Sequence, residues 1–153
     1  MQITYLSYFL ASIIAYLGLL LGIILIRLAP EEQRSGKKYF ILLKKILFFL
    51  IIVSILFFYK VNIILTTVLL LFMIILMLNR KINLDKLPLV YILLGVILFL
   101  SSKILDLFVI ESVLIFLFGV PASSLILKRN NYYDVFIRNL WFFIPVTLLH
   151  FVF

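Results

Sequence analysis

The first 26 residues carry no charged side chain, and this uncharged run restricts the fold of the chain more than any other feature. A helix that crosses a bilayer needs about 20 apolar residues. Further long apolar runs follow, and 67% of the chain is hydrophobic, whereas a soluble domain has roughly 45–50% apolar residues. A core surrounded by water cannot bury so large a fraction, so we expect lipid to surround the chain.

Backbone polar groups inside hydrocarbon must form hydrogen bonds within the protein, which leaves helices or closed barrels as spanning structures. A barrel would show alternating segments of about ten residues, whereas the apolar runs here are continuous. The sequence therefore predicts an all-α, polytopic transmembrane bundle in a single domain over residues 1–153. Its six predicted spanning helices cover residues 5–28, 39–59, 61–79, 87–102, 104–127 and 134–153. Five spans, with the sixth helix lying in the membrane interface, is the alternative.

The connections between the predicted helices are short, which favours antiparallel neighbours. The longest covers residues 29–38, where Pro30 and Gly36 predict a loop because proline cannot continue a helix interior and glycine relaxes the backbone. The second and third helices meet around Lys60, and the fourth and fifth meet around Lys103.

The basic residues predict the orientation. Twelve of the 14 lysines and arginines flank the connections after the first, third and fifth helices, and the other two are Lys60 and Lys103. The positive-inside rule places the twelve in the cytoplasm, so both termini are predicted to be extracytoplasmic in a multi-pass protein of the plasma (cytoplasmic) membrane. A nucleic-acid-binding domain would collect its basic residues on one soluble face, so the net charge of +8 indicates anionic lipid headgroups rather than nucleic acid.

Small residues form a stripe along the first predicted helix. They recur at steps of 4, 4, 3 and 4 residues, which places them on one helical face: Ser7, Ala11, Ala15, Gly18 and Gly22. In lipid, such a face allows another helix to approach closely. We expect this surface to pack the other helices, or to mediate self-association or contact with another membrane protein.

The stripe over Ala11–Gly22 resembles that of the substrate-binding subunits of energy-coupling-factor vitamin transporters. These are small six-helix proteins that use such a face to meet a partner helix. The resemblance is confined to this stripe, and the predicted orientation is opposite to theirs, so the chain is not assigned to that family.

Glu111 is the sharpest candidate for a functional residue within the membrane. It lies eight residues after Lys103, about 12 Å below the outer end of its helix at 1.5 Å per residue. Other polar residues are predicted in the same half of the membrane, which indicates an outward-facing polar cavity lined by Glu111, Asp106, Lys103, Thr66, Thr67, Ser54 and Thr147. The alternative is that the hydroxyls bind carbonyls of their own helices and Glu111 forms an interhelical hydrogen bond or snorkels.

Gly119 and Pro121 predict a kink in the fifth helix, since proline removes a hydrogen bond from the helix interior. Broken helices line substrate sites in some transporters. A kink repaired by neighbouring helices is the more common role of such a proline.

Catalytic motifs are missing from the sequence, and His150 has no second histidine beside it, so no cofactor or metal is expected. The leading expectation is a non-enzymatic subunit, assembly partner or scaffold that works through helix packing. A small transporter or channel that uses Glu111 comes second. An interfacial lipid-modifying enzyme comes third, and would need Arg27 or Arg34 to converge with acidic groups.

Overall fold

The computed structural model describes residues 4–28, 30–78, 89–126 and 140–152. Its elements are α1 (Tyr5–Leu28), α2 (Pro30–Phe58), α3 (Ile63–Leu78), α4 (Leu89–Ser101), α5 (Leu105–Ile126), the 3₁₀ turn η2 (Leu140–Phe142) and α7 (Phe143–Val152). All elements in these ranges are helical, which confirms the predicted helical fold.

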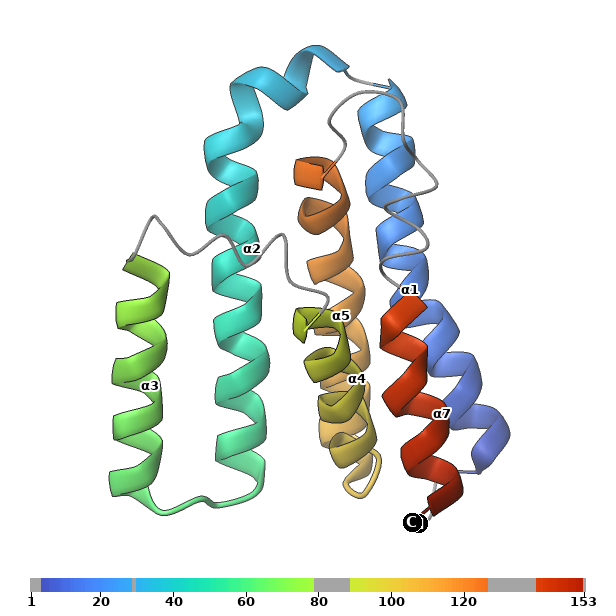
Figure 1. Cartoon of the computed structure of the whole chain (residues 1–153), viewed down its shortest axis with the longest axis vertical. Helices are drawn as coiled ribbons and strands as arrows, with labels where there is room; N and C mark the ends of the chain where they lie inside the picture. The colour runs from blue at the N-terminus through green and yellow to red at the C-terminus, as the bar shows by residue number, and fades with distance from the viewer. Residues whose placement is uncertain (1–3, 29, 79–88, 127–139, 153) are drawn as a thin grey trace.

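Helix α5 lies between α1 and α2 in the middle of the bundle (Figure 1). It runs parallel to α1, and Tyr8 of α1 stacks on Phe108 near the start of α5, with ring centroids 5.8 Å apart. It runs antiparallel to α2, where Phe48 meets Phe118 at a centroid distance of 6.1 Å. Helix α5 therefore forms two interfaces along its length, one seam with α1 and one seam with α2.

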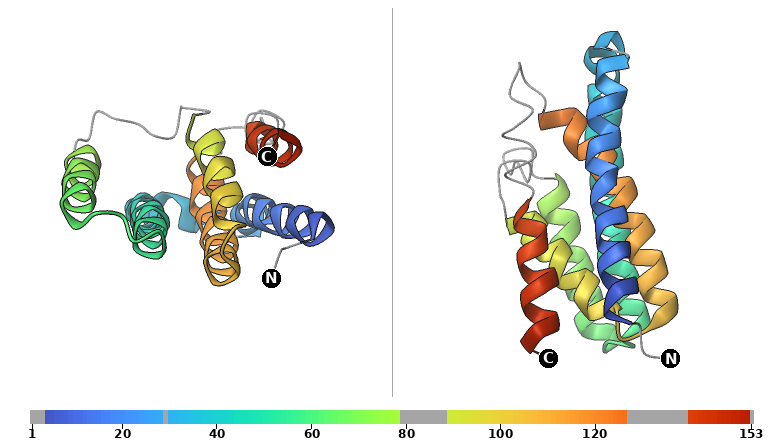
Figure 2. Two further views of the ribbon diagram at one scale, coloured as in Figure 1. Left: turned by 90° about the horizontal axis from the view of Figure 1, so that it is seen from below. Right: turned by 90° about the vertical axis from the view of Figure 1, so that its right-hand side faces the viewer.

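Helices α4 and α7 cover one side of this row, and α3 lies at its far edge beside α2 (Figure 2). The rings of Tyr16 and Phe143 link α1 to α7, with centroids 4.9 Å apart. The Tyr8 hydroxyl donates to the Val146 carbonyl at 3.3 Å. Gly95 supports the contact between α4 and η2, because a Cβ atom there would lie 2.5 Å from the Phe142 carbonyl oxygen.

The turn between α2 and α3 is built from local hydrogen bonds. Lys60 has a φ of 48°, and Val61 donates its N–H to the Leu56 carbonyl while Lys60 donates to Phe57, each at 3.2 Å. This pattern is a Schellman motif, which satisfies the last carbonyls of a helix. Asn62 then caps α3, since its side-chain oxygen accepts the Ile64 N–H at 3.0 Å.

The predicted loop over residues 29–38 is wrong from Pro30 onward, because α2 begins at Pro30. Proline is well suited to the first position of a helix, where its missing N–H would have no partner. The first turns of α2 cross the end of the bundle before the helix turns to run along α5 (Figure 1). Gly36 lies inside this helix, so the glycine does not end it.

Within the described residues, three helical stretches are long and apolar enough to cross a membrane, and they are Tyr5–Leu25, Gly36–Phe58 and Leu105–Leu125. The remaining apolar helical stretches in the described ranges are shorter: Ile63–Ile75, Leu89–Ser101 and Leu140–Leu149. The sixth predicted helix is described from Leu140 onward, so residues 134–139 of that prediction lie outside the described residues.

The outer surface of the bundle carries many exposed, large apolar side chains. Leu6, Phe57 and Ile63 are 68%, 77% and 80% exposed, which would be costly in water over so many residues. The core contains fully buried side chains such as Ile51 and Leu98. Apolar residues on both faces of long helices are typical of a protein that is surrounded by hydrocarbon.

Candidate functional site

The small-residue stripe of α1 lies largely against α5. Ala15, Gly18 and Gly22 are buried, whereas Ala11 is half-buried and Ser7 is exposed. A Cβ atom at Gly18 would overlap the carbonyl oxygen of Phe116 and would lie 2.7 Å from its carbonyl carbon. Backbone therefore meets backbone at this position, and no larger residue fits without moving a helix.

The contact is reciprocal and extends for one further turn. A Cβ atom at Gly119 of α5 would lie 2.6 Å from the Leu19 nitrogen of α1. A Cβ atom at Gly22 would overlap the Ser123 hydroxyl oxygen and the Val120 carbonyl oxygen. Glycines from both helices thus create the close approach, and within one chain α5 already occupies the middle and end of the stripe.

Pro121 lies inside α5, which continues as a helix from Leu105 to Ile126. The last part of the helix, drawn in orange, turns away from the axis of its first part (Figure 2). Pro121 is buried, and the Ser124 hydroxyl donates to the Val120 carbonyl at 2.8 Å. Gly119 and Pro121 are therefore packed within the bundle, where Gly119 also meets α1.

Glu111 is fully buried on the seam between α5 and α2. Its Oε1 atom contacts the hydroxyl of Ser54 on α2, and Ser54 Oγ also lies 2.9 Å from the Ile51 carbonyl oxygen. The second carboxyl oxygen, Oε2, is buried and has no hydrogen-bond partner among the described residues. Glu111 thus faces the protein interior, and Ser54 is the predicted cavity residue that contacts it.

The other predicted cavity residues do not join this pair. Asp106 and Lys103 are exposed near the start of α5. The three threonines bind carbonyls of their own segments: Thr66 donates to Val61 at 3.3 Å, Thr67 to Ile63 at 2.7 Å and Thr147 to Phe143 at 2.8 Å. Hydroxyls in apolar helices commonly satisfy themselves in this way.

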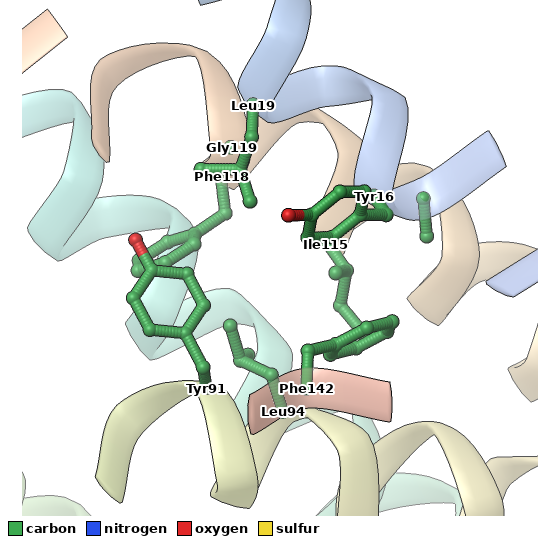
Figure 3. A pocket seen from close by; sticks show the side chains of 9 residues that line it. Tyr16, Leu19, Tyr91, Leu94, Ile115, Phe118, Gly119 and Phe142 are labelled. Atoms are coloured by element: carbon green, nitrogen blue, oxygen red, sulfur yellow. The ribbon is translucent and has the colours of Figure 1, made fainter. Parts of the chain in front are cut away.

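A small cavity lies elsewhere, between α1, α4, α5 and η2 (Figure 3). It holds about 240 Å³ of space between atoms, including its open side, and its walls are almost entirely apolar. Tyr16, Tyr91 and Phe142 supply rings to its walls. This cavity was not predicted from the sequence, and the available signal was Tyr16, which lies in the middle of an apolar run rather than at a helix end.

Lys44 is a second buried ionisable residue that the sequence analysis did not single out. It is 7% exposed, and its Nζ atom lies 5.7 Å from the centre of the Phe118 ring. This is a favourable arrangement of a cation over an aromatic face. From its place in the sequence, Lys44 was predicted to be one of the basic residues that flank the first connection. In the structure its side chain lies on the seam between α2 and α5.

The structure describes only some of the residues that were considered for metal binding or catalysis. No group of three histidine, cysteine or acidic side chains in the searched ranges could hold a metal ion. Asp85 and Asp134 lie outside the described residues. For Glu31, Glu32, Arg34 and His150 the structure describes the helical backbone but not the side chain. The convergence that a lipid-modifying enzyme would need is therefore not described.

Comparison of the chain with protein-family models, with curated proteins and with solved structures gives no match.

The contact between α1 and α5 predicts a strong response to one added methyl group. Gly18→Ala should lower the free energy of unfolding by about 1–3 kcal/mol, because the methyl group meets backbone that must move. Gly36→Ala is the control, since a Cβ atom there meets the ring of Phe40 at 3.0 Å rather than backbone. Thermal unfolding of both variants in the same detergent measures the difference, and equal melting temperatures would contradict the packing described.

Proposed function

We propose that this protein is a non-enzymatic component of a membrane assembly, a subunit or scaffold that works through contacts between transmembrane helices. The observation that carries the proposal is the exposure of α3. Between Ile63 and Ile75, only the stripe formed by Thr66, Leu70 and Met73 is partly covered, and the other side chains are exposed. This stripe has the spacing of one helical face, so α3 uses one narrow face toward its own bundle.

The position of α5 changes where a partner would bind. The sequence offered two roles for the stripe with Gly18 and Gly22, which were packing of the chain's own helices and contact with a partner. Contact with a partner there would require α1 to separate from α5. Binding at α3 requires no such separation. The proposed contact surface is therefore the exposed face of α3, and the partner is a second copy of the chain or another membrane protein.

Photo-crosslinking in native membranes tests this surface. A photoreactive phenylalanine analogue at Phe72 of α3 should give a discrete protein adduct. The same analogue at Ile14 of α1 is a matched control, because both positions are 57% exposed and each lies nine residues into its helix. Lipid adducts alone at Phe72, with the two positions behaving alike, would contradict the proposal.

We further propose six membrane-inserted segments with both termini outside the cytoplasm of the plasma membrane. The start of α1 and the end of α7 lie at the same end of the bundle, which supports an even number of crossings (Figure 2). The turns after α2 and α4 lie at that end as well, and they contain Lys60 and Lys103 (Figure 1). The end of α1, whose last turn contains Arg27, and the start of α2 lie at the opposite end (Figure 1).

Cysteine labelling tests the orientation directly, because the chain contains no cysteine. In intact cells, a maleimide that cannot cross the membrane should label Lys60→Cys and should label Lys37→Cys only after permeabilisation. Both residues are exposed, Lys60 just after the end of α2 and Lys37 at the start of the apolar stretch Gly36–Phe58, so each is accessible to the reagent. The reverse pattern, or labelling of both variants from one side, would refute the proposed topology.

A small transporter or channel is the second candidate function. The burial of Glu111 between α2 and α5 favours it, since ionisable residues that face the interior of a membrane bundle often mark ion pathways. In liposomes, an ion flux carried by the wild-type protein should be lost in Glu111→Gln and retained in Asp106→Asn, which alters an exposed acid on the same helix. A flux unaffected by Glu111→Gln would exclude this role for Glu111.

A further inference from the structure

We infer that the Glu111 carboxyl is a proton-binding site, occupied as a neutral acid within the membrane. In this arrangement the protonated Glu111 donates to Ser54, and Ser54 donates to the Ile51 carbonyl. The chain of two hydrogen bonds joins α5 to α2. The inference holds whether the protein is a subunit or a transporter, because it depends only on the surroundings of this side chain.

The first argument is a count of protons. Ser54 Oγ lies 2.9 Å from the Ile51 carbonyl oxygen and also contacts Glu111 Oε1. A hydroxyl group carries one proton, so it cannot fully supply both contacts. A proton shared between the two acceptors would leave both bonds weak. A proton on Glu111 allows both hydrogen bonds to form, because Ser54 then accepts from the carboxyl group and donates to the Ile51 carbonyl.

The second argument comes from burial. Glu111 is fully buried, and its Oε2 atom has no hydrogen-bond partner among the described residues. An ionised carboxylate spreads its charge over both oxygens, so an unpartnered oxygen would leave half of a buried charge unsatisfied. In a neutral acid the same atom is an ordinary carbonyl oxygen, and leaving it unpaired costs much less.

The charged side chains named next are not placed to neutralise Glu111 instead of a proton. Lys44 is the buried cation on the same seam, but it lies ten residues before Ser54 on α2, which corresponds to about 15 Å along the helix. Its Nζ atom lies over Phe118, seven residues beyond Glu111 on α5. Lys103 and Asp106 are exposed near the start of α5. The proton is therefore the ligand that the described geometry supports.

Infrared spectroscopy of the purified full chain in lipid at neutral pH tests the inference, because the carbonyl stretch of a protonated acid is separate from that of a carboxylate. The wild-type protein should show the protonated-acid band. Glu111→Gln should remove the band while leaving the helical content and melting temperature close to wild type, because glutamine has the shape of the neutral acid. Asp106→Asn is the matched control on the same helix and should leave the band in place.

Ser54→Ala provides an independent check, because it removes the acceptor of the proposed Glu111 proton. The protonated-acid band should remain and shift to higher frequency as its hydrogen bond is lost. Three outcomes would overturn the inference: absence of the band in the wild-type protein, persistence of the band in Glu111→Gln, or loss of the band when sodium or potassium ions are added. The last outcome would identify a cation site in place of a proton site.

Discussion

The close approach of α1 and α5 is the contact on which the rest of the bundle depends. Glycines from both helices meet the opposite backbone, and α5 then presents its other side to α2. Lipid offers no hydrophobic driving force between helices, so dispersion contacts at short range must hold them together. Small residues are effective in lipid for this reason, because they allow many backbone atoms to come into contact.

The polar residues are also constrained by the absence of water around the helices, because their hydrogen-bond partners must come from the protein. Threonine and serine hydroxyls bind carbonyls of their own helices, as Thr67 and Ser124 do. Ser54 differs from them because it also reaches across to Glu111. Among the described cavity candidates, Ser54 and Glu111 provide the polar contact between helices. Glu111 belongs to α5, the helix against which α1 packs. Helix α5 thus carries both the close contact with α1 and the buried acid Glu111.

The sequence predicted the helical fold because apolar runs and the absence of water leave few alternatives. It placed the starts of α3 and α5 and the end of α4 within two residues, since charges and short turns flank them. It misplaced the start of α2, because Pro30 reads equally well as a loop residue and as the first residue of a helix. Which helix covers Gly18, and which polar residues meet, depend on tertiary packing that no local spacing encodes. Gly95 illustrates this limit, since one glycine in an apolar run gives no sign that it faces η2.

A double-mutant cycle between Gly22 and Ser123 measures the central contact most directly. A Cβ atom at Gly22 would overlap the Ser123 hydroxyl, so Gly22→Ala should destabilise the protein less when Ser123→Ala is also present. Residues in contact show coupling energies of about 0.5–3 kcal/mol, whereas distant residues add within about 0.5 kcal/mol. Unfolding free energies of the single and double variants should reveal coupling in this range. Simple additivity would show that Gly22 of α1 does not meet the Ser123 side chain of α5.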